Sequence, residues 1–217
     1  EESGKMLAAM YMLQKGTPFI YQGQEIGMTD IRLPKLDMYE DVSTYNAHRL
    51  YKSVLHFPED KIMNILKKRS RDNARTPVQW SSEKNAGFTT ADKPWFYINE
   101  NYWQINVEDQ EKDKNSLLNF YRKLIKFRKQ YKVVRDGVYK EHYENSSKIY
   151  CYERVLGNEK LLVVCSFTDK PVEFTAPKGY NLEEGKLMLA NYDKNMRKHN
   201  TFKTRPYEMR VYYFGDK

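Results

Sequence analysis

The sequence contains few of the features on which functional predictions usually rest. Only two cysteines, Cys151 and Cys165, occur in 217 residues, too few for a disulfide framework, so free buried thiols are expected although neighbouring strands would permit a bridge. No apolar run approaches the ~20 residues that cross a bilayer. The first residues also lack the basic stretch and apolar core of a secretory signal. We therefore exclude a membrane-spanning or disulfide-stabilised protein and expect a cytoplasmic one.

Familiar catalytic motifs are also missing. The chain has no GxSxG, P-loop or dinucleotide-binding motif. Its four histidines lie far apart, with none of the spacings that bind zinc: His48, His56, His142 and His199. The acidic residues of one loop are expected to be solvated charges, not an acid–base pair: Asp30, Asp37, Glu40 and Asp41. No catalytic residue, no metal ligand and no resident cofactor is expected from these patterns.

The charge balance is basic but gives little information about partners. Lys plus Arg is 37 and Asp plus Glu is 29, a difference of +8, and the isoelectric point is near 9.2. A basic balance and 18 tyrosines are compatible with nucleic-acid binding. The charges are interspersed, however, which favours ordinary solvated faces. We expect neither a nucleic-acid nor a membrane partner.

Residues up to about 131 show a mixed helical and irregular pattern. Apolar residues with helical spacing predict a helix over 3–15, ended by Gly16. The run Phe19–Gln22 predicts a short buried strand. Further helices are predicted over 115–130, from a cap at Asp113 or Asn115, and in two shorter segments that begin near Asp41 and Asp60. The segment 69–110 is irregular but rich in aromatic residues, which indicates packed structure.

From about residue 132 the pattern becomes that of an all-β domain. The stretch 133–143 is expected to be extended. Two apolar runs flank Gly157-Asn158, which predicts a hairpin. Strands are also expected near 187–189 and 209–214. Short strands separated by turn residues favour an antiparallel sandwich, so we predict two domains, 1–131 and 132–217.

Two stretches carry a family resemblance. One is the thirteen-residue run from Gly16 to Met28, GTPFIYQGQEIGM. The other is RDNARTPVQW from Arg71 to Trp80, followed by NAGFTT from Asn85. With further matches near 101–108, 123–128, 191–193 and 205–208, the chain resembles the oligo-1,6-glucosidase, dextran glucosidase and trehalose-6-phosphate hydrolase group. This group belongs to the α-amylase superfamily, glycoside hydrolase family 13.

The resemblance implies an architecture of α/β plus all-β type. Residues 3–15 resemble the seventh helix of a TIM (β/α)8 barrel, Phe19–Gln22 its last strand, and 24–110 the long connection that follows. Residues 115–130 resemble the last barrel helix, and the remainder resembles the C-terminal β-sandwich. The family's nucleophile, its general acid and a third carboxylate would all lie upstream of Glu1. We therefore expect a C-terminal fragment that is inactive alone.

The residues expected to bind substrate lie in the long connection, where barrel loops build the active site. Arg71 matches the family arginine that reaches the glucose at the cleavage site, because guanidinium presents five donors in a rigid fork. Gln24 is expected to line the aglycone side, with a loop residue that does not contact the substrate as the alternative. Asp72 and Arg75 are expected to support the site. Trp80 and the aromatic residues of 95–103 are expected to lie in the core, with a sugar-stacking platform as the alternative.

The resemblance implies a retaining α-glucosidase that removes terminal α-linked glucose from an oligosaccharide or disaccharide. It also implies a monomer without a cofactor. Calcium would be bound, if at all, by residues upstream. The linkage stays open among isomaltose, dextran, trehalose 6-phosphate and sucrose. A non-catalytic carbohydrate-binding or scaffold unit is the alternative, since the β-sandwich and the missing carboxylates suit it.

Overall fold

The computed structural model describes residues 1–193 and 199–215. It divides into two compact units, 1–20 with 115–217 and 21–114. The helices are α1 Glu2–Met12, α2 Val42–Ser53, α3 Glu59–Arg69, α4 Val107–Lys112, α5 Leu117–Gln130 and α6 Lys132–Asp136. The strands are β1 Val138–His142, β2 Ile149–Leu156, β3 Glu159–Ser166, β4 Glu173–Thr175, β5 Lys186–Ala190, β6 Thr201–Lys203 and β7 Met209–Phe214.

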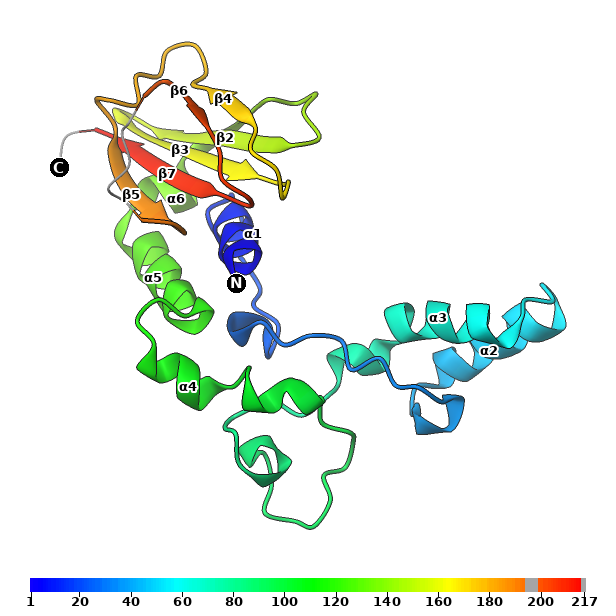
Figure 1. Cartoon of the computed structure of the whole chain (residues 1–217). Coiled ribbons are helices and arrows are strands. Elements are labelled where there is room, and N and C mark those ends of the chain that lie inside the picture. Colours follow the sequence, from blue (N-terminus) through cyan, green and yellow to red (C-terminus); the bar gives the residue numbers. More distant parts are fainter. Residues whose placement is uncertain (194–198, 216–217) are drawn as a thin grey trace. The chain divides into compact units, whose positions relative to one another are not determined.

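A five-stranded antiparallel sheet forms the centre of the first unit. Its strand order is β1-β2-β3-β7-β5, and β4 pairs separately with β6. Helices α1, α5 and α6 cover one face, while the β4–β6 ribbon lies over the other (Figure 1). The predicted hairpin is confirmed: β2 and β3 are joined through Gly157, whose φ of 57° suits the tight turn.

The two cysteines lie on opposite faces of this sheet. Cys151 is paired in register with Val164, and Cys165 with Tyr150. Because cross-strand partners share a face and successive residues alternate, Cys151 packs on the ribbon side and Cys165 on the helix side. Both are free thiols, and burial raises the pKa of each. The expectation of free buried thiols is confirmed, and the strand pleat is what prevents a bridge.

At the C-terminal end of helix α1, two arginines donate hydrogen bonds to backbone carbonyl groups. Arg128 donates from Nη1 to the Met12 oxygen at 2.8 Å and to the Gln14 oxygen at 3.0 Å. Arg154, fully buried, donates to the Leu13 oxygen at 3.1 Å. Cations at a helix C-terminus satisfy carbonyls that have no intrahelical partner. The helix thus stops at Met12, before the predicted end at residue 15, although Gly16 has the expected positive φ of 103°.

Two family-like stretches near the C-terminus tie the sheet together. Asn191 donates to the Tyr207 oxygen at 2.8 Å and accepts from the Met209 backbone N–H at 2.8 Å. Glu208, almost fully buried, pairs with Arg210 at 3.0 Å and with Arg205 at 3.2 Å. These contacts give the stretches a structural role within the sheet.

Three local predictions are wrong. Ser116, not Asp113 or Asn115, caps α5, because its hydroxyl accepts from the Asn119 N–H at 3.2 Å. Residues 132–136 form α6 before the chain becomes extended. The run Phe19–Gln22 is not a strand. No other strand in 1–193 or 199–215 pairs with it, and a ladder requires a neighbour; Phe19 is consequently 85% exposed.

The domain boundary expected at 131/132 does not coincide with the division into compact units. Helices α1 and α5 pack on the sheet face through a shared core that includes Leu124 and Val163, so the unit with the sheet begins again at residue 115. The compact units reflect which segments share a core, whereas the predicted boundary marks only where the sequence changes from a helical to a strand pattern. The boundary itself stays a prediction. No helix in the described residues is long and apolar enough to cross a membrane.

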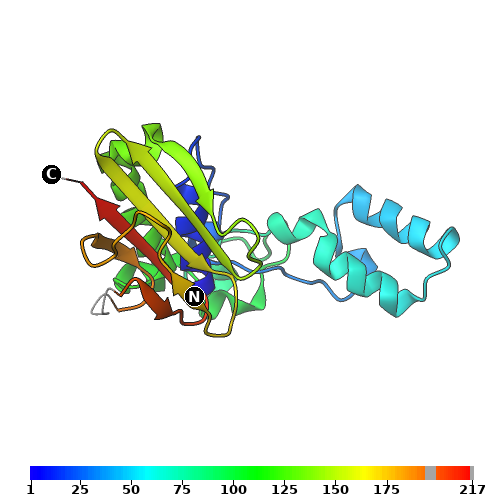
Figure 2. The same ribbon diagram turned by 90° about the horizontal axis from the view of Figure 1, so that it is seen from above.

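The second unit, 21–114, is built on one helical hairpin and several short turns. Helices α2 and α3 lie side by side (Figure 2). Asp41 caps α2, since its side chain accepts from the Ser43 backbone N–H at 3.3 Å, as the sequence predicts. Apart from the short helix α4, the rest of the unit is largely irregular, as expected, with 3₁₀ turns at Arg71–Ala74, Lys84–Gly87 and Glu100–Trp103.

Candidate substrate-binding site

The candidate site is centred on Arg71, at the start of the 3₁₀ turn that follows α3. Its guanidinium forms a bidentate contact with Asp41: Nη2 donates to Oδ1 at 2.7 Å and Nε donates to Oδ2 at 3.0 Å. The Asp41 side chain is 3% exposed, whereas that of Arg71 is 63% exposed. Two of the five guanidinium N–H bonds therefore hold the plane in place, and the solvent-facing side can bind a polar ligand.

Asp72 organises the backbone around this pair. One of its buried oxygens accepts the Glu40 N–H at 2.8 Å and the Asp41 N–H at 2.9 Å. Its own N–H donates to the Ser70 hydroxyl oxygen at 3.2 Å, and Ser70 contacts the Thr44 hydroxyl at 2.8 Å. The two segments that carry Asp41 and Arg71, thirty residues apart in sequence, are thus joined by buried hydrogen bonds.

Arg75 adds a second cation to the two buried carboxylates. Its Nη1 lies 3.6 Å from Asp41 Oδ1 and 3.7 Å from Asp72 Oδ1, with the side chain partly exposed. At these distances the contribution is a longer-range Coulombic one, because the geometry is not that of a strong hydrogen bond. Arg75 offsets the charge of the acidic pair in the arrangement observed.

Gln24 lies in a separate turn. Its Oε1 accepts the Tyr21 N–H at 3.1 Å, and the flanking residues Gly23 and Gly27 have φ values of 84° and 74°. Tyr21 also donates through its hydroxyl to the Ala74 oxygen at 2.7 Å, which links this turn to the segment of Arg71. Within the described residues no hydrogen bond joins Gln24 directly to Arg71. The structure therefore brings Arg71, Asp72 and Arg75 together. Gln24 is connected to their segment only indirectly, through Tyr21.

Asp41 is the residue that sequence reasoning placed wrongly. It was expected to be a solvated loop charge, and it is a buried partner of Arg71. The sequence did contain one signal of this role, the predicted capping position of Asp41. A carboxylate that caps a helix is held at the helix end and is not a free loop charge. Tyr21 was also missed as a link, since it was assigned to a strand.

Electrostatics hold Asp41 in its ionised form. The hydrogen bonds from Arg71, together with those from Ser43, hold the pKa of the Asp41 carboxyl well below its ordinary value near 3.8, against the effect of burial. The same pair raises the pKa of Arg71. Within the described residues no group of three or more His, Cys, Asp or Glu side chains is placed to hold a metal ion.

The lowered pKa of Asp41 predicts acid sensitivity of the unit 21–114. The unfolded chain takes up a proton as pH falls through about 3.8 while the folded chain resists it, so stability present above that pH is lost below it. All three tryptophans lie in this unit, so their fluorescence reports its unfolding by urea. We expect the urea concentration at the midpoint of unfolding to decrease as pH falls below about 5. In Arg71→Ala this decrease is expected to be smaller. Equal pH dependence in both proteins would contradict the assignment.

Comparison with known proteins agrees with this architecture. The alpha amylase catalytic domain family matches residues 1–137. An oligo-1,6-glucosidase of Halalkalibacterium halodurans is 42% identical over 212 residues, covering 97% of this chain and 37% of the relative. A trehalose-6-phosphate hydrolase of Bacillus subtilis is 39% identical over 212 residues, covering 97% of this chain and 37% of the relative.

Solved structures show the same likeness. The trehalose-6-phosphate hydrolase of Bacillus licheniformis superposes with a TM-score of 0.92 at 38% identity, covering 100% of this chain and 39% of that one. An isomaltulose synthase mutant of Erwinia rhapontici, in complex with sucrose, gives 0.92 at 33% identity, covering 100% of this chain and 38% of that one.

A family match over more than half of the chain, with these relatives, identifies the class. The chain belongs to the α-amylase family of glycoside hydrolases, family 13, and its relatives include oligo-1,6-glucosidases and trehalose-6-phosphate hydrolases. It spans 37% of the length of the Halalkalibacterium halodurans relative.

Proposed function

We propose that this chain is the C-terminal portion of a retaining α-glucosidase that releases terminal α-linked glucose from short oligosaccharides or disaccharides. The observation that carries the proposal is the Arg71–Asp41 pair. It presents a fixed, solvent-facing guanidinium on a segment that carries the family motif RDNARTPVQW. The names of the relatives support the same class of substrate.

In this proposal the chain supplies binding and not bond cleavage. Retention requires a carboxylate nucleophile and a carboxylic acid about 5 Å apart across the glycosidic bond. Asp41 and Asp72 are poor candidates for either, because Asp41 is committed to Arg71 and Asp72 to two backbone N–H groups. Arg71 would hold sugar hydroxyls with its remaining donors, Gln24 would line the aglycone side, and Asp72 and Arg75 would maintain the loop. The intact protein is proposed to be cytoplasmic and monomeric, with any calcium ligands upstream.

A chimera tests this proposal. The isolated chain is expected to give no hydrolysis of p-nitrophenyl α-glucoside above the buffer rate. When it replaces the homologous C-terminal part of the Bacillus cereus oligo-1,6-glucosidase, 41% identical over 213 residues, the chimera is expected to hydrolyse that substrate. Turnover by the isolated chain would contradict the division of roles. A folded chimera without activity would contradict the proposed function.

A further inference from the structure

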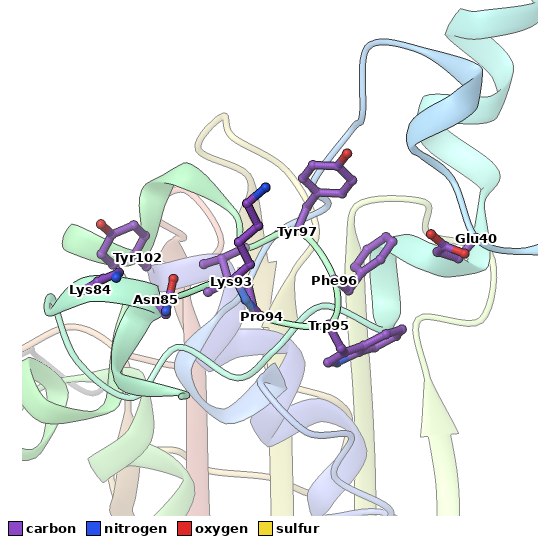
Figure 3. A pocket seen from close by; sticks show the side chains of 10 residues that line it. Glu40, Lys84, Asn85, Lys93, Pro94, Trp95, Phe96, Tyr97 and Tyr102 are labelled. Carbon is purple, nitrogen blue, oxygen red and sulfur yellow. The ribbon is translucent and has the colours of Figure 1, made fainter. Parts of the chain in front are cut away.

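A cavity within the unit 21–114 is not part of the site described above. Its volume is about 610 Å³, within the range of roughly 300–1,000 Å³ typical of small-molecule sites. The lining combines aromatic and polar side chains, among them Glu40, Asn85, Lys93, Trp95, Tyr97 and Tyr102 (Figure 3). Every lining residue belongs to this one compact unit.

A buried ring fixes the aromatic wall. Phe96 is buried with Leu33 and Tyr39. The rings of Trp95 and Tyr97 lie 5.2 Å and 5.7 Å from the Phe96 ring, between centroids. Trp95 itself is 64% exposed, contrary to the expectation that the aromatic residues of this stretch form core. The buried anchor holds an exposed indole in place, which lowers the entropic cost of binding a ligand to it.

A strained loop forms another part of the wall. Asn85, Ala86 and Gly87 have successive φ values of 55°, 54° and 64°. Asn85 donates to the Ala91 oxygen at 2.7 Å, and buried Ala86 accepts from the Trp80 N–H at 2.9 Å. Non-glycine residues rarely adopt the left-handed region, and those that do are concentrated at functional sites. The hydrogen bond to the Ala91 oxygen holds the Asn85 side chain in place beside the cavity.

The polar lining suits a ligand with hydroxyl groups. Glu40 offers only acceptors and Lys93 only donors, and a hydroxyl satisfies both kinds. The Asp72 carboxylate, which accepts the Glu40 N–H at 2.8 Å, fixes the backbone of Glu40. Lys84, the other lining cation, lies 3.5 Å from Asp92. The remaining pair of opposite charges favours a neutral ligand over an ionic one.

We propose that this cavity is a second carbohydrate-binding site, which holds a pyranose ring of a neutral oligosaccharide stacked on Trp95 and hydrogen-bonded by Glu40 and Lys93. A pyranose has an apolar C–H face and a rim of hydroxyls. The positively polarised C–H groups are attracted to the negative face of an indole. The proposed ligand contacts include neither Arg71 nor the upstream carboxylates, so this site can bind sugar when the proposed glucosidase activity is absent, although Asp72 supports the backbone of both sites.

Titration of the full 217-residue chain with isomaltotriose, followed by NMR amide shifts, tests the proposal. We expect saturable shifts that include residues 84–102, away from Arg71, with a Kd in the millimolar range, about −4 kcal/mol. Trp95→Ala is expected to raise the Kd about tenfold. Trp103→Ala is the matched control, because Trp103 is 63% exposed and does not line the cavity. It is expected to change the Kd less than about twofold.

Several results would overturn the proposal. These are an absence of saturable shifts, an equal loss in both tryptophan variants, an equal response to glycerol, or shifts confined to the sheet unit. Glu40→Gln, which keeps the shape of the side chain, provides a second variant in case Trp95→Ala disturbs folding. It is expected to raise the Kd about fivefold, the scale of one ordinary hydrogen bond. An unchanged Kd in Glu40→Gln would remove this residue from the site.

Discussion

Replacing Arg71 by alanine in the active chimera is expected to lower kcat/KM for an aryl α-glucoside by roughly tenfold to a thousandfold. That range corresponds to losing one or two oriented donors that act on the transition state. The salt bridge to Asp41 explains why the donors are oriented: it fixes the guanidinium before any sugar arrives, so little rotamer entropy is lost on binding. Steady-state kinetics with the purified variant measure the effect.

Two further variants separate binding from support of the fold. Arg69→Ala removes an exposed arginine at the end of α3, two residues away, and is expected to leave kcat/KM within about twofold of the parent. Arg71→Lys keeps the charge but not the bidentate geometry, so it is expected to resemble Arg71→Ala more than the parent. A loss of activity that only matches a loss of folded protein, measured by tryptophan fluorescence, would make Arg71 structural. Unaltered kinetics would remove it from the site.

Replacing Asp72 by alanine is expected to lower the free energy of unfolding of the unit 21–114 by about 3 kcal/mol or more. The buried carboxylate accepts two backbone N–H groups, and each hydrogen bond to a charged group contributes about 1.5–3 kcal/mol. Without it, the N–H groups of Glu40 and Asp41 would lose their partner. Urea unfolding followed by tryptophan fluorescence reports this unit, because all three tryptophans lie in it.

Asp92→Ala serves as the matched control for Asp72→Ala. Asp92 has a fully exposed side chain and a long surface contact to Lys84, so its removal is expected to change stability by less than about 0.5 kcal/mol. Hydrogen exchange gives a local readout: the amides of Glu40 and Asp41 are expected to exchange faster in Asp72→Ala. Unchanged exchange at these two amides would show that the carboxylate does not hold the segment.

The Asp72 network connects both sites. Through one buried oxygen it fixes Asp41, which orients Arg71, and Glu40, which faces the second cavity. Buried hydrogen bonds of this kind place side chains from distant segments with little freedom. Asp72→Ala is therefore expected to disturb both sites, whereas Arg71→Ala and Trp95→Ala act on one site each.

Local sequence pattern predicted the regular elements well. The helices α1, α2, α3 and α5 and the β2–β3 hairpin depend on side-chain periodicity, caps and a turn, which are properties of neighbouring residues. Asp41 as a cap and Gly157 in the hairpin turn are examples. The motif at Arg71 also carried the family, because a run of ten specific residues rarely recurs outside it.

Predictions that depended on distant partners were less successful. Phe19–Gln22 has the composition of a strand, but a strand exists only where another offers its hydrogen-bonding edge. Trp80 and Trp103 were expected to be buried and are more than half exposed, because burial depends on what packs from other segments. Asp41 was expected to be solvated for the same reason: its partner Arg71 lies thirty residues away.

The sequence by itself determined the class of this protein, most of its helices, its hairpin and the segment that carries the candidate site. These follow from short-range chemistry and from motifs that can be read along one stretch of chain. Only the tertiary structure decided that Asp41 and Asp72 lie buried beneath Arg71, that the two cysteines lie on opposite faces of a sheet, and that Trp95 stands exposed over a cavity. Each of these features depends on how segments far apart in sequence pack against one another, and that packing is a property of the folded chain.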